Sequence, residues 1–162
     1  MTIETKKHYF NVLDTQKSQV KYYYVKNDLL YIPIINAGVF DHELNAQSTI
    51  KYLPPIMLVF ENVKNVELKF YEVNKLILKI QNIGLDSDDH RKDCFGFNIV
   101  DSKHYLEIEI NSDNAYFYLF RIEDAVSFED LEKTLDIFFE NGLPNSGKFQ
   151  FRDLQSMAIF NK

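Results

Sequence analysis

Alternation of apolar and polar residues dominates the segment Ile56–Arg121, and it predicts β-strands. Within this segment, apolar side chains occupy every second position in 66–71, 75–81 and 105–110. A strand with one apolar and one polar face is typical of an antiparallel sheet that is covered on one side. Residues 56–60 are apolar throughout, so we expect this strand to be covered on both faces.

Short polar segments separate six such apolar runs and predict that the runs pair in sequence order as a meander. The segments at 61–65, 72–74, 101–103 and 111–114 are rich in Asn and Asp, which favour tight turns. The predicted fold is α+β and mostly β: an antiparallel meander sheet, curved or two-layered, that one main C-terminal helix covers. The positions expected to be buried are Val66, Leu68, Phe70, Leu76, Leu78, Ile80, Leu106 and Ile108.

Residues 128–141 carry the pattern of an amphipathic helix. Ser127 is suited to cap its N-terminus, and Gly142 followed by Pro144 would end it. The apolar stripe that should face the sheet includes Leu131, Leu135 and Phe138.

The first third of the chain predicts one hairpin. Its arms are Val20–Val25 and Leu29–Ile35, joined by 26–28. Pro33 has no backbone N–H to donate, so we expect the second arm to be an edge strand or to leave the sheet there. Residues 36–53 show no strong periodicity and are interpreted either as a surface loop with a short strand around Ser48–Tyr52 or as a functional loop whose role is unassigned.

Composition indicates a single soluble domain over residues 1–162. The chain has 162 residues and is 46% hydrophobic, enough to form a core without covalent cross-links. Its one cysteine, Cys94, excludes an internal disulfide and favours a reducing compartment. No signal-peptide pattern and no apolar run of bilayer length occur, so we expect a cytoplasmic protein with no membrane partner.

The negative charge is concentrated late in the chain. Residues 101–140 contain eleven acidic and three basic side chains, whereas 1–100 contain twelve of each. Such a surface repels nucleic acid and attracts basic proteins, although a face that only aids solubility is the alternative. The residues proposed to bind a partner are Tyr105, Glu107, Glu109, Glu129, Glu132 and Asp136.

Several tyrosines are candidates for a recognition surface. Exposed tyrosine beside acidic residues is suited to protein binding, although burial under a loop or a second sheet is the alternative for each. The tyrosines are Tyr22, Tyr23, Tyr24, Tyr116 and Tyr118.

No catalytic motif, cofactor site or metal site is expected. Residues 142–148 match the glycine and lysine spacing of a phosphate-binding loop, but a helix precedes them and a strand follows, so we predict a turn. The acidic segment 86–90 lacks the glycine and final acid of a calcium loop, and His90 and Cys94 are poorly spaced for zinc. Asp41-His42-Glu43 is the most enzyme-like triplet, and only its geometry could make it catalytic.

The run Ile56-Met-Leu-Val-Phe-Glu-Asn-Val63, followed by alternating strands and a late acidic segment, resembles the small cytoplasmic immunity proteins of bacterial polymorphic toxin systems. The resemblance covers Ile56–Arg121. It implies a stoichiometric inhibitor that covers the active site of a toxin, and it assigns no role to any single residue.

Three functions follow as hypotheses. The first is a non-enzymatic protein-binding domain, an immunity protein that inhibits a basic toxin or nuclease through an acidic surface. The second is a small-ligand site inside a barrel-like sheet, with His42 or His104 at its mouth. The third is a structural or assembly protein that forms a homodimer by pairing edge strands.

Overall fold

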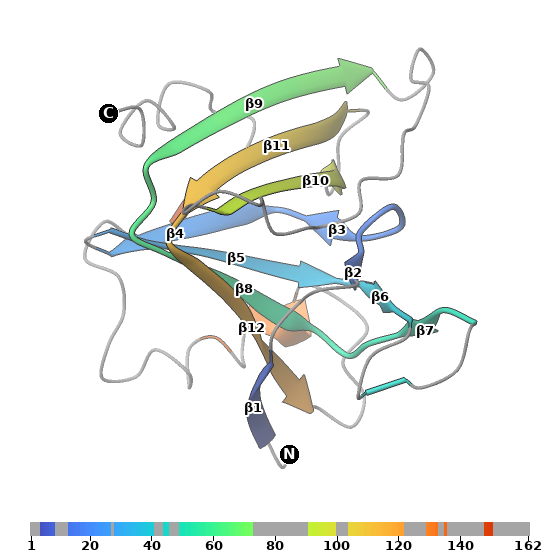
Figure 1. Cartoon of the computed structure of the whole chain (residues 1–162). Helices are drawn as coiled ribbons and strands as arrows, with labels where there is room; N and C mark the ends of the chain where they lie inside the picture. Colours follow the sequence, from blue (N-terminus) through green and yellow to red (C-terminus); the bar gives the residue numbers. More distant parts are fainter. Residues whose placement is uncertain are drawn as a thin grey trace.

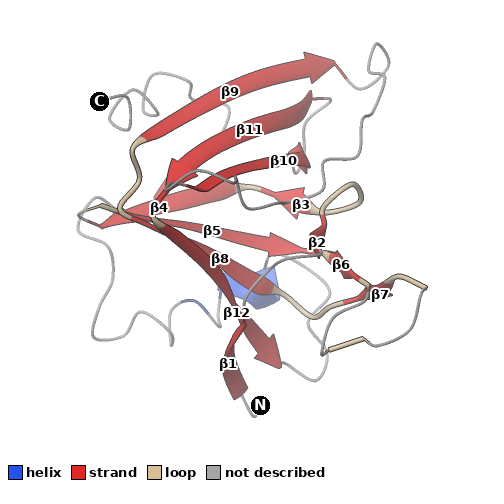
Figure 2. Cartoon of the chain, viewed as in Figure 1, coloured by secondary structure: helices blue, strands red, loops and turns tan. Residues whose placement is uncertain are grey.

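The described part of the chain is mostly β-structure (Figures 1 and 2). The computed structural model describes residues 4–8, 13–26, 28–40, 44–45, 49–72, 91–99, 104–121, 129–132, 135 and 148–150. The strands are β1 (Glu4–His8), β2 (Leu13–Asp14), β3 (Gln19–Val20), β4 (Tyr22–Lys26), β5 (Leu29–Ile35), β6 (Gly38–Val39), β7 (Lys51–Tyr52), β8 (Ile56–Glu61), β9 (Asn65–Glu72), β10 (Arg91–Ile99), β11 (His104–Ser112), β12 (Asn114–Arg121) and β13 (Lys148–Gln150). Strands β2, β6 and β7 form a small separate sheet, and the other ten form one large sheet. Within the described ranges, no helix is both long and apolar enough to cross a membrane.

Two long, bent strands organise the large sheet. β8 continues into β9 and β11 continues into β12, and the two chain segments run antiparallel, β8 beside β12 and β9 beside β11. Glu61 pairs with Asn114 before the bend, and Asn65 pairs with Asn111 after it. Three residues, 62–64, therefore face only two, 112–113, which is a β-bulge. The extra residue bends both strands and sends their two halves into different parts of the sheet.

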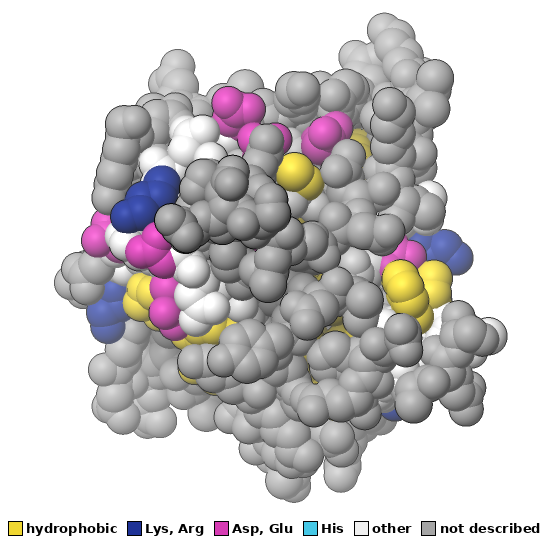
Figure 3. Space-filling view, in the orientation of Figure 1, with side chains coloured by type: hydrophobic (Ala, Val, Ile, Leu, Met, Phe, Trp, Pro, Cys, Tyr) yellow, Lys and Arg dark blue, Asp and Glu magenta, His cyan; other side chains and the backbone are white. Residues whose placement is uncertain are grey.

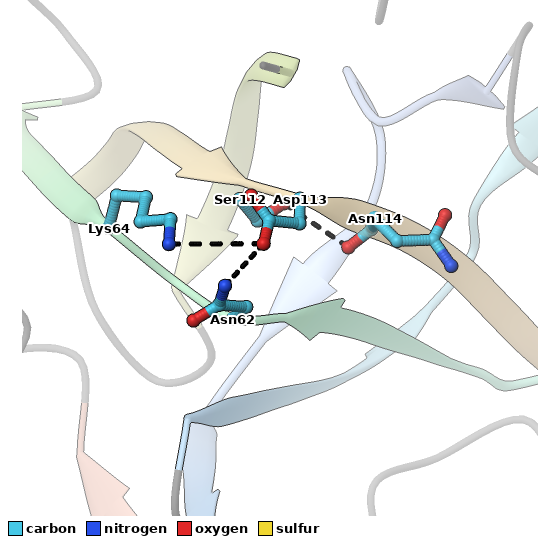
Figure 4. A network of polar contacts seen from close by, with 5 residues as sticks. All are labelled: Asn62, Lys64, Ser112, Asp113 and Asn114. Atoms are coloured by element: carbon cyan, nitrogen blue, oxygen red, sulfur yellow. Dashed lines mark hydrogen bonds and ion pairs between the residues drawn. The ribbon is translucent and has the colours of Figure 1, made fainter. Parts of the chain in front are cut away.

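Polar contacts hold this bend (Figure 4). The Asp113 amide donates to the Glu61 carbonyl at 3.0 Å, and the Lys64 amide donates to the Asn111 carbonyl at 2.8 Å. The Asp113 carboxylate accepts a hydrogen bond from the Asn62 side-chain amide and forms an ion pair with Lys64 Nζ at 3.8 Å. Asn62 has a φ of 53°, a left-handed conformation that Asn tolerates better than most residues.

The pairings of the large sheet form a closed circuit. β8 pairs with β5, β5 with β3, β3 with β10 and β10 with β11, and β11 continues into β12, which pairs with β8 again. In Figure 1, β9, β11 and β10 lie above β3 and β4, and β5, β8 and β12 lie below them. We call β9, β10 and β11 the upper half of the sheet and β5, β8 and β12 the lower half. The bend allows the same two chain segments to belong to both halves.

One short parallel pairing completes the circuit. β3 and β10 share only two residue pairs, Gln19 with Asn98 and Val20 with Ile99. The Asn98 amide donates to the Ser18 carbonyl at 2.9 Å, and the Asn98 side-chain amide lies 3.2 Å from the Gln16 carbonyl oxygen. Asn98 therefore provides much of the polar contact along this seam.

A second bulge explains how Pro33 fits into a central strand. β5 pairs with β8 on one side and with β3 and β4 on the other, so the expectation of an edge strand was wrong. Val20 pairs with Ile34 and Tyr24 pairs with Tyr31, so three residues, 21–23, face two on β5, one of which is Pro33. Proline within a sheet is tolerated at bulges, where the hydrogen-bond ladder is already interrupted.

Apolar side chains form two clusters on opposite faces of the sheet. The inner core lies within the circuit and includes Leu58, Phe60, Phe95 and Phe117. The outer cluster lies on the other face of the lower half. β8 contributes to both, because Ile56, Leu58 and Phe60 point into the inner core and Met57 and Val59 into the outer cluster. The prediction that this strand is covered on both faces is confirmed.

The predicted meander order was wrong, although the strands themselves were placed well. Among the described strands of the predicted meander, only β10 and β11 pair as expected: β8 does not pair with β9, and β11 does not pair with β12. The predicted run 75–81 lies outside the described residues. Val66, Leu106 and Ile108 are buried as predicted. The side chains of Leu68 and Phe70, and all of residues 76–80, lie outside the described residues.

The helix is a short stretch in the described residues, 129–132 with 135, and not the main cover of the sheet that the sequence predicted. Leu131 and Leu135 are buried in the outer cluster, as the predicted stripe requires. The expected cap Ser127 and the expected stripe residue Phe138 lie outside the described residues.

Substitution of Asn62 tests the bend. Asn62→Ala should lower the free energy of unfolding by roughly 1–3 kcal/mol, because Ala is strained at positive φ and loses the contact with Asp113. Asn62→Gly should lose less, because Gly adopts this conformation without strain. Urea denaturation measures the free energy of unfolding of both variants. Equal losses of stability in the two variants would show that Asn62 does not stabilise the bend through its left-handed backbone conformation.

Alternation along β11 gives a second test. Ile108 is fully buried in the inner core, so Ile108→Ala should cost about 2–5 kcal/mol. Its neighbour Glu107 points to the opposite face and is half-exposed, so Glu107→Ala should change stability by only about 0.5 kcal/mol. Thermal melts that rank the two variants the other way would contradict the assigned faces.

Candidate protein-binding surfaces

The outer face of β9 and β11 carries a group of carboxylates that we call the acidic ladder: Glu67, Glu107 and Glu109. The side chains of Leu106, Ile108 and Ile110 fill the inner core, so the residues between them on β11 point outward. Glu107 and Glu109 are half-exposed and Glu67 is exposed. Acidic side chains gather over β9 and β11 in Figure 3.

Two carboxylates of the ladder face each other directly. Glu109 on β11 and Glu67 on β9 are register partners in the antiparallel pair. Like charges at directly opposed positions destabilise a sheet, so this arrangement has a cost for folding. On the other side of Glu109, the Cys94 thiol donates to its carboxylate with Sγ at 3.8 Å from Oε2. A cation close to both carboxylates would offset this cost.

Tyr105 does not contribute an exposed ring to this face. The side chain is only 4% exposed, because it lies across Gly96 of the neighbouring strand. A Cβ atom at position 96 would fall 1.6 Å from the Tyr105 hydroxyl oxygen, so only glycine leaves space for it. Tyr105 was predicted to bind a partner together with Glu107 and Glu109, but the structure leaves an acidic surface whose tyrosine is buried.

The other predicted partner-binding residues lie on a different face. Glu129 and Glu132 belong to the helical stretch that packs on the outer cluster through Leu131. Glu129 is exposed, whereas Glu132 forms an ion pair with Lys21 at 3.6 Å. Asp136 lies outside the described residues. The structure thus separates Glu107 and Glu109 from the helical acids, and the six residues do not make one patch.

Most of the tyrosines considered from the sequence gather on the outer face of the lower half-sheet. Tyr22, Tyr24 and Tyr116 belong to the outer cluster and Tyr118 packs against it, whereas Tyr23 points into the inner core. Their rings meet edge to face: the centroids are 5.6 Å apart in the Tyr22–Tyr24 pair and also in the Tyr116–Tyr118 pair. These orientations are favourable for aromatic pairs.

Sequence reasoning missed Tyr31, which is part of the same face. It is half-buried and is the register partner of Tyr24 on one side and of Val59 on the other. Its position two residues after Leu29 on an alternating strand was the available signal. Pro33 obscured that signal, because it suggested that the strand leaves the sheet.

Two glutamates influence the titration of these tyrosines. Burial, followed by the effects of Tyr24 and Glu132, raises the pKa of Tyr22. Burial, followed by a hydrogen bond to Glu61, also raises the pKa of Tyr116. The phenols therefore stay protonated and can donate hydrogen bonds throughout the physiological range.

The residues considered for catalysis and metal binding are not assembled into a site in the described structure. Asp41, His42 and Glu43 lie outside the described residues, as do 86–90 and 142–147. His104 begins β11, where only its backbone is described. Among the side chains that are described, no group of three or more His, Cys, Asp or Glu could hold a metal ion.

Alkaline pH provides a test of the Tyr105 environment. Burial, followed by the charges of Glu107 and Asp14, raises the pKa of Tyr105 to about 12, whereas an unfolded chain has a tyrosine pKa of about 10. The unfolded state therefore releases this proton first, and the contribution of Tyr105 to stability should be constant below about pH 10 and fall between about pH 10 and 12.

Tyr105→Phe removes the titrating group, so its urea midpoint should fall less between about pH 9 and pH 11 than that of the wild type. The other tyrosines with raised pKa values remain in the variant and leave a residual decline. Identical declines in both proteins would contradict the assigned environment.

No protein-family model matches this chain, and no curated protein and no solved structure matches it either.

Proposed function

We propose that this chain is a non-enzymatic, stoichiometric protein-binding domain that binds a basic partner through the acidic ladder. The observation that carries the proposal is the direct opposition of Glu67 and Glu109, with Glu107 on the next outward position of β11. Opposed carboxylates are unfavourable in a sheet, and a cation placed between them offsets that cost. A Lys or Arg of a partner would form ion pairs with these carboxylates.

Charge distribution over the whole chain supports the same partner chemistry. The formal net charge is −6, and the excess negative charge is concentrated in residues 101–140, which include Glu107 and Glu109. Complementary charge increases the association rate of two proteins and selects partners of opposite sign. The same field disfavours nucleic acid as a ligand.

The finer proposal is an immunity protein that acts in the cytoplasm by covering the active site of a bacterial toxin. Its support is the resemblance of Ile56–Arg121 to such proteins together with the acidic ladder. A toxin that handles nucleic acid, such as a nuclease, needs a basic surface to bind phosphates. An acidic inhibitor can occupy that surface in place of the substrate.

Packing of the inner core favours binding on an outer face over the small-ligand alternative. Phe60, Phe95, Phe97 and Phe117 are fully buried within the circuit. Phe60 meets Phe95 edge to face at 5.7 Å, and Phe95 stacks on Phe97 at 5.5 Å. These rings occupy space that a barrel-like binding protein would leave to its ligand.

Charge reversal tests the proposal. Glu67→Lys with Glu109→Lys changes the net charge from −6 to −2 and keeps like charges opposed, so the stability of the sheet should change little. Glu129→Lys with Glu132→Lys makes the same charge change on the helical stretch and serves as the control. The wild type and both variants are used as bait to capture proteins from the native host at about 0.05 M and about 0.5 M salt.

We expect one basic protein to bind the wild type and the control variant in a stoichiometric complex, and to be lost from the ladder variant. The difference in captured protein between the wild type and the ladder variant should shrink at high salt, because salt screens the attraction between the carboxylates and the basic protein. Loss from the control variant alone would place the interface on the helical face and refute the role of the ladder. Equal capture by all three baits would refute charge-based recognition.

A further inference from the structure

Three tyrosines and a glutamate converge on the outer face of the lower half-sheet, close to the bend. Tyr31, Val59 and Tyr116 form one row across β5, β8 and β12, since each is the register partner of the next. Glu61 lies two residues beyond Val59 on β8 and points to the same face, so it is diagonal to both tyrosines. Tyr118, two residues from Tyr116 on β12, lies diagonal to Val59 on the other side.

The side chains of this cluster interact with one another. The rings of Tyr116 and Tyr118 meet at 85°, with their centroids 5.6 Å apart. Burial, followed by the effects of Tyr118 and Glu61, raises the pKa of Tyr31, and burial followed by the effect of Glu61 raises the pKa of Tyr116. The cluster therefore combines ring faces, phenol oxygens and one carboxylate in a small area.

The centre of the cluster is buried, and its outer residues are partly exposed. Val59 at its centre is fully buried and Tyr116 is 7% exposed. Tyr31, Tyr118 and Glu61 are half-exposed, so each keeps part of its surface accessible to solvent.

We propose that Tyr31, Tyr116, Tyr118 and Glu61 bind an arginine side chain of the basic partner. This inference rests on the proposed function and extends it to a second contact around the bend from the acidic ladder. The two contacts lie along the same pair of bent strands, because the Asp113 amide binds the Glu61 carbonyl at the bend and Glu67 pairs with Glu109 beyond it.

Arginine fits the cluster better than lysine or an apolar side chain. The faces of tyrosine rings attract cations, and a planar guanidinium can stack on a ring while it donates several hydrogen bonds in its own plane. The carboxylate and the phenol oxygens are the acceptors for those hydrogen bonds. A lysine ammonium has no flat face to stack, and an apolar group would leave Glu61 without a charge partner.

Short peptides test the site without the natural partner. The probes are acetyl-Gly-Arg-Gly-amide and its lysine counterpart, and the readout is NMR of the full chain with labelled tyrosine rings. The arginine peptide should shift the ring signals of Tyr31, Tyr116 and Tyr118 and bind roughly three- to fivefold more tightly than the lysine peptide. No shift of these rings, or equal binding of both peptides, would overturn the proposal.

Substitutions localise the binding. Glu61→Gln keeps the size of the side chain and removes its charge, and Tyr118→Leu removes one ring; each should weaken the arginine peptide about fivefold or more. Tyr118→Phe retains the ring and should weaken it less. Tyr52→Leu is the control, because Tyr52 is an exposed tyrosine of the small sheet, 43% exposed, with Lys17 over its ring at 5.7 Å. A loss in the control equal to that in Tyr118→Leu would refute the assigned site.

These experiments distinguish a failure of the arginine site from a failure of the proposed function. The ladder variant, Glu67→Lys with Glu109→Lys, should keep the peptide-induced shifts. Peptide binding without any captured basic protein would refute the proposed function and leave the arginine site standing. A captured basic protein that binds Glu61→Gln and Tyr118→Leu as tightly as the wild type would refute the arginine site alone.

Discussion

The bend at residues 61–64 and 111–113 is the constraint on which the rest of the structure depends. The two long strands pair in register on both sides of the bend, and one strand has an extra residue between the paired parts. This bulge bends both strands, so that each belongs to both halves of the sheet. The inner core exists because these halves face each other, and the circuit of pairings closes because the same segments belong to both. At the point where the ladder is interrupted, Asn62 adopts a left-handed conformation and its side-chain amide donates to the Asp113 carboxylate.

The same bend determines which residues reach the surface together. Along 106–117, the inward positions run through Ile108, Ile110 and Ala115, so the strict alternation of a strand is broken once. Without that break, residues of β11 would exchange faces, and Glu107 and Glu109 would point into the core. The outer faces on either side of the bend hence form adjoining surfaces, one acidic and one rich in tyrosine.

Alternation is a local property, and it predicted the strands from β8 to β12 nearly where they lie. Their pairing was not predictable in the same way, because an Asn- and Asp-rich segment can serve either as a hairpin turn or as a bulge. Residues 61–65 and 111–114 were interpreted as turns, yet the chain continues through both. Pro33 was likewise misjudged because its accommodation depends on an extra residue in a neighbouring strand. The candidate site has a similar limit: Tyr105 is buried because a neighbouring strand places Gly96 beneath it, which no spacing within β11 reveals.

Closure of the circuit through only two residue pairs between β3 and β10 has a consequence for how the chain folds and opens. These strands are separated by about seventy residues in sequence, so their pairing requires an entropically costly loop closure and is expected late in folding. Once formed, this seam and the equally short β3–β5 pairing are the shortest interfaces in the circuit, so β3 is the natural place for local opening. Such an opening would expose one edge of the aromatic core to solvent while the bent pair of long strands stays intact, which makes the Asn98 amide a sensitive reporter of the first step of unfolding by hydrogen exchange.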